Sequence, residues 1–138
     1  MKVLFVCMAN VGRSQMAEAF FAHMAPRHHA TSAGFLVLPE REGRPISEVT
    51  DKVIQSMQEE GIDMSAKVQN KITPAMVEEA DKVIVLAPEA ALPDFLEYSP
   101  KLEIWNVSDA GGTDQAFHHH TRDLIKEKVR NLIQRIDS

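Results

Sequence analysis

The chain of 138 residues has little cysteine, glycine or aromatic side chain, and each shortage excludes a class of protein. Its single cysteine, Cys7, rules out an internal disulfide and a metal site built from four cysteines. Six glycines and seven prolines are too few for a collagen-like or low-complexity chain. No run of 18 apolar residues occurs, so the sequence predicts no membrane-spanning helix.

Positive charge is also scarce. Fifteen Lys and Arg residues face twenty Asp and Glu residues, a net charge of −5, so we expect no general attraction to nucleic acid or to an anionic membrane. Any anion site has to be built locally. The length and the 44% hydrophobic content predict a single globular domain over residues 1–138. The apolar N-terminus lacks a small-residue cleavage pattern behind it, so we expect a cytoplasmic protein.

Strand-like and helix-like segments alternate along the chain. Continuous apolar runs predict strands at residues 2–6 and 82–86. Weaker patterns predict two more strands, at residues 29–34 and 101–107. Helical spacing predicts helices over residues 14–25, from Ser47 to Gly61, from Thr73-Pro74, and from about Asp114 to the C-terminus. The last helix should pack its apolar stripe, which includes Leu124, against the sheet.

This order of elements is typical of an α/β fold. We expect a three-layer structure in which a four-stranded parallel sheet carries helices on both faces and right-handed crossovers join the strands. Ligands of such sheets bind at the carboxyl ends of the strands. A functional site is therefore expected where the first strand ends, at Cys7.

The segment Cys7-Met-Ala-Asn-Val-Gly-Arg13-Ser14 joins the first predicted strand to the first predicted helix. A loop at this place can aim successive backbone N–H groups at one point, and the helix adds its positive N-terminal end, which suits a tetrahedral oxyanion. The same field, with Arg13, favours the thiolate form of Cys7. Alternatively, Cys7 is a buried strand-end residue and Arg13 an exposed helix-start residue, but their joint placement favours the functional interpretation.

The other residues of this loop also have predicted tasks. The planar Arg13 side chain can bind two oxygens of a phosphoryl group, which a lysine could not do. Gly12 lets the backbone approach the anion, and Asn10 tolerates a left-handed conformation and can tie the loop together. Ser14 can donate a hydrogen bond to the sulfur. The remaining backbone donors to phosphate belong to Met8, Ala9 and Val11.

Residues 7–14 resemble the phosphate-binding loop of the low molecular weight protein tyrosine phosphatase family, which also includes arsenate reductases of the same fold. The resemblance continues at Met16-Ala-Glu-Ala19, at Thr31-Ser-Ala-Gly34 and at Gly61-Ile-Asp63, and it covers nearly the whole chain. It implies that Cys7 attacks phosphorus and forms a phosphocysteine, with no metal or organic cofactor.

The resemblance also implies a late aspartate that protonates the leaving oxygen and then activates water. Asp109, just after the last predicted strand, matches this residue. Family members usually carry proline next, whereas this chain has Ala110 and two glycines, which makes the loop more flexible. Asp114 is the alternative acid, although a role in capping the last helix accounts for it better.

Aromatic residues bear on the choice of substrate. Phosphotyrosine-selective members line their pocket with aromatic rings, which are scarce here, and a single tryptophan and a single tyrosine occur. A pocket with fewer rings discriminates less for aryl phosphates and admits arsenate or small phosphoesters as readily. From the resemblance we expect a phosphatase acting on phosphotyrosine in proteins or on small aryl phosphates, with arsenate reductase as the alternative. Arsenate reduction would need an external thiol, from a small molecule or a redoxin, because this chain lacks the cysteines of an internal disulfide relay.

Two further functions fit the sequence less well. A phosphocarrier domain has a similar loop but generally lacks the arginine at the position of Arg13, and a pure anion-binding module would need no acid. Three adjacent histidines, His118 to His120, cannot converge on one metal ion from a single helix, so we expect a solvent-exposed helix face there.

Overall fold

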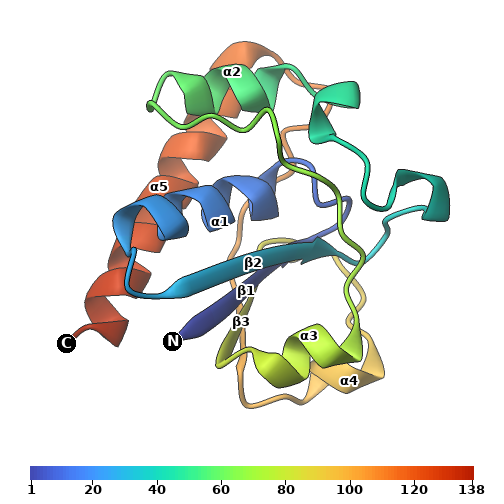
Figure 1. Ribbon diagram of the computed structural model, residues 1–138, viewed down its shortest axis with the longest axis vertical. Coiled ribbons are helices and arrows are strands. Elements are labelled where there is room, and N and C mark those ends of the chain that lie inside the picture. The colour runs from blue at the N-terminus through green and yellow to red at the C-terminus, as the bar shows by residue number, and fades with distance from the viewer.

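The computed structural model describes residues 1–138 and has the predicted three-layer α/β architecture (Figure 1). Four parallel strands form one sheet in the order β2-β1-β3-β4: β1 (Lys2–Cys7), β2 (His29–Gly34), β3 (Lys82–Val85) and β4 (Leu102–Ile104). Helices α1 (Arg13–Met24), α2 (Lys52–Gln58) and α5 (Gln115–Ile136) lie on one side of the sheet. Helices α3 (Pro74–Glu79) and α4 (Asp94–Glu97) lie on the other.

The central strand β1 is buried on both faces, as its continuous apolar run predicts. Val3 and Phe5 point into the larger core beneath α1, α2 and α5. Leu4 and Val6 point into the smaller core beneath α3 and α4. All four side chains are fully buried, so β1 is a rigid support for the residue at its end, Cys7.

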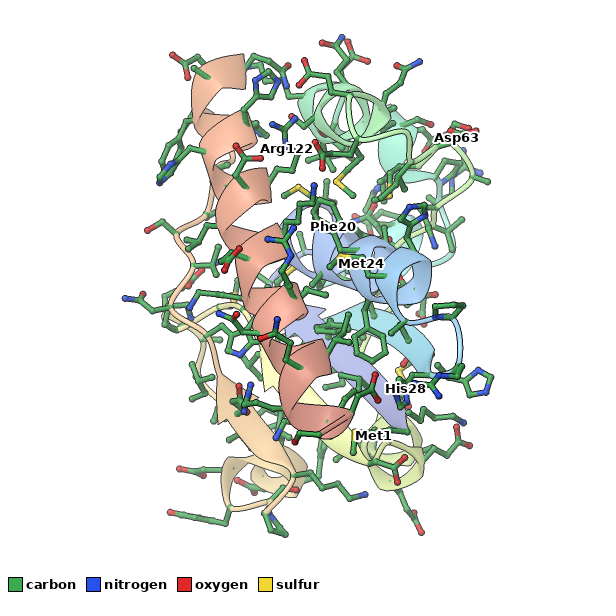
Figure 2. All side chains as sticks on the ribbon, turned by 90° about the vertical axis from the view of Figure 1, so that its left-hand side faces the viewer. Met1, Phe20, Met24, His28, Asp63 and Arg122 are labelled. Carbon is green, nitrogen blue, oxygen red and sulfur yellow. The ribbon has the colours of Figure 1, made fainter.

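The long helix α5 packs across α1 (Figure 2), with Phe20 of α1 in their shared core. Arg122 of α5 ties this helix to α2 by donating to the Ser56 carbonyl (2.9 Å) and to Glu59 (2.7 Å). The predicted apolar stripe is correct for the buried Ile125, Val129 and Leu132. It is wrong for Leu124, which is exposed because it lies about 100° around the helix from the buried Ile125.

The second predicted helix begins later than the sequence indicates. A short 3-10 turn over Ile46–Glu48 ends where the N–H groups of Val49 and Thr50 both donate to the Ile46 carbonyl. Helix α2 starts anew at Lys52, where the Thr50 hydroxyl accepts from the Val53 N–H. This break places Val49 at the surface instead of inside a helix.

Other boundaries differ less. The fourth strand is an edge strand of three residues, shorter than the predicted 101–107, although Trp105 N still donates to the Val85 carbonyl. Helix α4, one turn after Pro93, was not predicted. Another 3-10 turn, Pro39–Arg41, lies within the predicted loop over residues 35–45. None of the helices has the length and apolar character needed to cross a membrane.

Candidate active site

The loop after β1 is shaped by direct contact with β2. Cys7 pairs with Gly34 across the two strands, and the loop folds back so that Leu36 N donates to the Met8 carbonyl. A Cβ atom on Gly34 would lie 2.6 Å from the Met8 oxygen and 2.9 Å from the Asn10 nitrogen. Only glycine therefore fits beneath the loop, which gives Gly34 of the family-like segment a physical role.

Asn10 holds the loop from the inside. It adopts a positive φ of 57°, as its predicted tolerance of left-handed backbone allows, and it is fully buried. Its amide nitrogen donates to the hydroxyls of Ser14 (2.8 Å) and Ser32 (3.0 Å), and its oxygen accepts from Asn70 N (2.8 Å). Gln69 adds a bond to the Ala9 carbonyl (3.0 Å). The loop backbone is thus fixed from one side.

The backbone N–H groups of residues 8–12 donate to no protein acceptor. They directly precede Arg13, the first residue of α1. The hydrogen bonds that hold this loop use the Ala9 carbonyl and the Asn10 side chain, and so leave these N–H groups free. A run of such N–H groups at the start of a helix forms an anion-binding nest. The structure therefore supplies the donors that a tetrahedral oxyanion needs.

The sulfur of Cys7 lies at the base of this loop, 2.9 Å from the Ser14 hydroxyl oxygen. The Asn10 amide also donates to that hydroxyl, which leaves the hydroxyl hydrogen free to point at the sulfur. When Cys7 is a thiolate, Ser14 is the donor of this bond, which then stabilises the negative charge on the sulfur. Both side chains are buried, and Ser14 and Asn10 lie beneath the loop and do not line the pocket above it.

The Arg13 guanidinium is only 4% exposed and has two partners that hold it. Nη1 donates to the Val107 carbonyl (2.9 Å) and to Glu89 Oε1 (3.1 Å), and Nη2 donates to Glu89 Oε2 (2.7 Å). Burial by itself lowers the pKa of Arg13, but Glu89, Cys7 and Asp109 outweigh it and raise that pKa above its ordinary value. Arg13 thus keeps its full charge in the site.

A pocket of about 480 Å³ opens above the sulfur. The lining includes Cys7, five of the other predicted phosphate-binding residues and the predicted acid Asp109. Those five residues are Met8, Ala9, Val11, Gly12 and Arg13. Topology explains this meeting, because the carboxyl ends of β1 and β4 lie at the same edge of the parallel sheet.

The structure gives the two candidate acids different surroundings. Asp109 is exposed, and its Oδ1 accepts from Gly111 N (2.9 Å), which shapes the turn that contains Ala110 and the two glycines. Asp114 instead caps α5 by accepting from Phe117 N (2.9 Å), and it does not line the pocket. Lys52 of α2 donates to the Thr113 carbonyl (2.6 Å) and so fastens the loop that carries Asp109.

The histidine cluster differs from its prediction. His118 is buried and lines the pocket, with Nδ1 3.0 Å from the Asp114 carbonyl, so the expectation of a fully solvent-exposed face is wrong for this residue. The helix turns inward there because its N-terminal end meets the loop over residues 109–113. His119 lies 3.2 Å from Glu59, and His120 stacks on Phe117.

Several residues of the site were missed by sequence reasoning. Gln69, Asn70 and Glu89 reach the loop from segments 60 and 76 residues away in the chain. Each lies in a loop without hydrophobic periodicity, so no local pattern marks it. For Glu89 the one available signal was its place after β3, at the carboxyl edge of the sheet.

The walls of the pocket are aliphatic and polar. Its lining contains no phenylalanine, tyrosine or tryptophan. Tyr98 is 88% exposed outside the pocket, and Trp105 is buried in the core, where its Nε1 donates to Glu103. The expectation that few rings face the substrate therefore agrees with the structure.

Comparisons with known proteins agree with this geometry. Arsenate reductase of Bacillus licheniformis is 32% identical over 142 residues, covering 96% of this chain and 94% of that protein. Glutaredoxin arsenate reductase of Synechocystis sp. is 33% identical over 137 residues, covering 98% of each. The crystal structure of a low molecular weight protein tyrosine phosphatase from T. tengcongensis shares the fold, with a TM-score of 0.81, 24% identity, and coverage of 98% of this chain and 99% of that one.

One family model matches almost the whole chain. The low molecular weight phosphotyrosine protein phosphatase family matches residues 2–138, which include the loop, the segment beneath it and the loop of Asp109. From the fold and this match, the chain belongs to the low molecular weight phosphotyrosine protein phosphatase family.

Proposed function

We propose that this protein is a cysteine-dependent phosphatase that hydrolyses phosphomonoesters through a phosphocysteine intermediate. One observation carries the proposal: Cys7, Arg13 and Asp109 line the same pocket, and the chain contains no second thiol. Hydrolysis is the complete cycle that these residues can perform with water alone. An internal disulfide relay is excluded by the single cysteine.

The first step is an in-line displacement at phosphorus. The Cys7 sulfur forms the S–P bond as the P–O bond to the leaving group breaks, and Asp109 gives its proton to the leaving oxygen. Charge that builds on the phosphoryl oxygens is met by Arg13 and by the backbone N–H groups of residues 8–12.

The second step reverses the role of the acid. Asp109, now a carboxylate, takes a proton from a water molecule as the water oxygen attacks phosphorus, and the P–S bond breaks to release inorganic phosphate. The hydrogen bond from Ser14 suits Cys7 as the leaving group, because it stabilises the thiolate that forms. No electron transfer is needed in either step.

The pocket supports a preference for small or aliphatic phosphoesters over phosphotyrosine. Met8, Met16, Val49 and Val53 offer apolar contact, but no phenylalanine, tyrosine or tryptophan is present to stack on a phenyl group, and the only ring in the lining is the His118 imidazole. Such aromatic pairs contribute about 0.5–1.5 kcal/mol each beyond the burial of area. We therefore expect phosphotyrosine peptides to be turned over no faster than simple phosphoesters.

Arsenate reduction with an external thiol is the second candidate, because two relatives about one-third identical are arsenate reductases and a pocket without phenylalanine, tyrosine or tryptophan suits a bare oxyanion. Cys7 would displace one oxygen of arsenate, which leaves as water. A small-molecule thiol or a redoxin would then attack the Cys7 sulfur, so that arsenite departs with the electron pair and a mixed disulfide remains. A second thiol would reduce that disulfide.

Both activities can be measured on one purified sample. Release of phosphate from p-nitrophenyl phosphate, an alkyl phosphate and a phosphotyrosine peptide would be compared with arsenite formation in the presence of a small thiol, glutaredoxin or thioredoxin. We expect phosphate release without any thiol, and its loss in Cys7→Ser. Arsenite formation without phosphoester turnover would overturn the phosphatase proposal in favour of the reductase.

A further inference from the structure

Glu89 contacts the Arg13 guanidinium from outside the pocket. It lies in the loop between β3 and α4, and both of its carboxylate oxygens accept from Arg13, at 3.1 and 2.7 Å. Arg13 lines the pocket, whereas Glu89 does not. The carboxylate therefore holds Arg13 from behind and does not compete for the place of the oxyanion.

The five N–H bonds of the guanidinium can be accounted for one by one. Both Nη1 hydrogens are taken, one by Glu89 and one by the Val107 carbonyl, and one Nη2 hydrogen is taken by Glu89. The Nε hydrogen and the outer Nη2 hydrogen have no protein acceptor. These two lie side by side along one edge of the plane, where they can reach two oxygens of a single phosphoryl group.

We propose that Glu89 is a positioning residue, which occupies the Nη1/Nη2 end of Arg13 and thereby presents the Nε/Nη2 edge to a tetrahedral oxyanion in the loop. A buried guanidinium without this partner would turn toward other acceptors and lose the alignment that the transition state needs. The inference deepens the proposed function, on which its kinetic test rests. It concerns which face of Arg13 meets the substrate.

The two effects of removing Glu89 act in opposite directions on substrate binding. Loss of the negative charge strengthens the attraction of the site for an anion, whereas loss of alignment weakens it. These two effects partly cancel in substrate binding. Turnover depends in addition on the alignment of Arg13 with the transition state, so the loss of alignment should appear mainly in kcat. A misplaced catalytic group of this kind typically lowers turnover by about 10- to 100-fold.

The kinetic test compares Glu89→Gln with Glu89→Asp, using p-nitrophenyl phosphate. In Glu89→Gln an amide NH2 replaces one acceptor, and we expect kcat to fall about 10- to 100-fold while KM changes less than about threefold. Glu89→Asp keeps both carboxylate oxygens and the charge, so its kcat should lie between the kcat of wild type and the kcat of Glu89→Gln. A kcat of Glu89→Gln within twofold of wild type, a loss confined to KM, or no recovery in Glu89→Asp would overturn the inference.

Glu103→Gln is the matched control. Glu103 also accepts from both terminal nitrogens of an arginine, Arg135 (3.2 and 2.9 Å), but it lies on β4 and does not line the pocket. We expect this variant to lose stability and to keep the wild-type kcat. A similar fall of kcat in both variants would show a general effect of destabilisation and would overturn the specific role of Glu89.

A crystal structure with inorganic phosphate tests the inference without turnover. We expect phosphate oxygens on Nε and Nη2 of Arg13 while Glu89 still accepts from Nη1 and Nη2. Phosphate bound to the Nη1/Nη2 end with Glu89 displaced would overturn the inference. If the expected arrangement is found in a protein that hydrolyses no phosphoester, the proposed function fails and the role of Glu89 stands.

Discussion

Replacing Gly34 by alanine should displace the loop that follows Cys7 and so lower activity more than stability. The added Cβ would lie 2.6 Å from the Met8 oxygen, and an ordinary contact begins at 3.4 Å, so the loop must move by about 0.8 Å. Misplacement by about 1 Å can lower an enzymatic rate about 100-fold. We therefore expect kcat/KM to fall about 10- to 100-fold, which corresponds to about 1.4–2.7 kcal/mol of transition-state stabilisation.

The assay is turnover of p-nitrophenyl phosphate, with urea unfolding to measure the free energy of unfolding. Gly61→Ala is the matched control, because Gly61 has a φ of +75°, meets nothing within 4 Å and does not line the pocket. Alanine there should cost about 1 kcal/mol of stability through backbone strain and leave kcat/KM unchanged. If folded Gly34→Ala keeps kcat/KM within twofold of wild type, the loop is not held against β2 as described.

Three further changes separate catalytic from structural carboxylates. Asp109→Asn should slow hydrolysis most for esters with poor leaving groups, and an equal effect on good and poor leaving groups would remove Asp109 from the role of acid. Asp114→Asn should leave that dependence unchanged and alter stability by less than about 1 kcal/mol, as expected for a helix cap that asparagine can also provide; a leaving-group effect there would exchange the two assignments. The pKa of Glu103 is lowered from 4.5 to about 2, mainly by its hydrogen bonds from Arg135. Burial opposes this shift, and Trp105 and Lys82 add to it. The ionised Glu103 should therefore contribute about 2 kcal/mol to the free energy of unfolding, after allowance for solvent screening. This contribution should be present above about pH 4.5 and lost as the pH falls toward 2. Urea unfolding of wild type and Glu103→Gln across this range checks the sign, and a difference that grows in acid would contradict it.

The sequence was most informative where burial imposes a recognisable pattern of apolar residues. The apolar runs of β1 and β3 and the stripe of α5 reflect packing on fixed faces, so the parallel sheet could be predicted from them. The site followed from topology, because strands in a parallel sheet end at the same edge. That rule brought Asp109 toward Cys7 although they are far apart in the chain.

The details that escaped prediction depend on contacts between distant loops. The delayed start of α2 follows from two hydrogen bonds to the Ile46 carbonyl, which helical spacing alone does not show. Glu89 and Gln69 reach the active-site loop through single side chains, and such polar contacts leave no periodic pattern. His118 was misassigned because a helix face that is exposed elsewhere is covered here by the loop over residues 109–113.

The most direct test of the account is rapid quenching of the reaction with p-nitrophenyl phosphate, followed by mass spectrometry of the peptide that contains Cys7. We predict a phosphoryl group on the Cys7 sulfur, present in larger amount in Asp109→Asn because that variant lacks the base for the second step. Cys7→Ser should give neither turnover nor a phosphorylated sulfur. Undiminished turnover in Cys7→Ser, or a phosphoryl group found on another side chain of the wild-type protein, would contradict the central claim that this sulfur is the nucleophile.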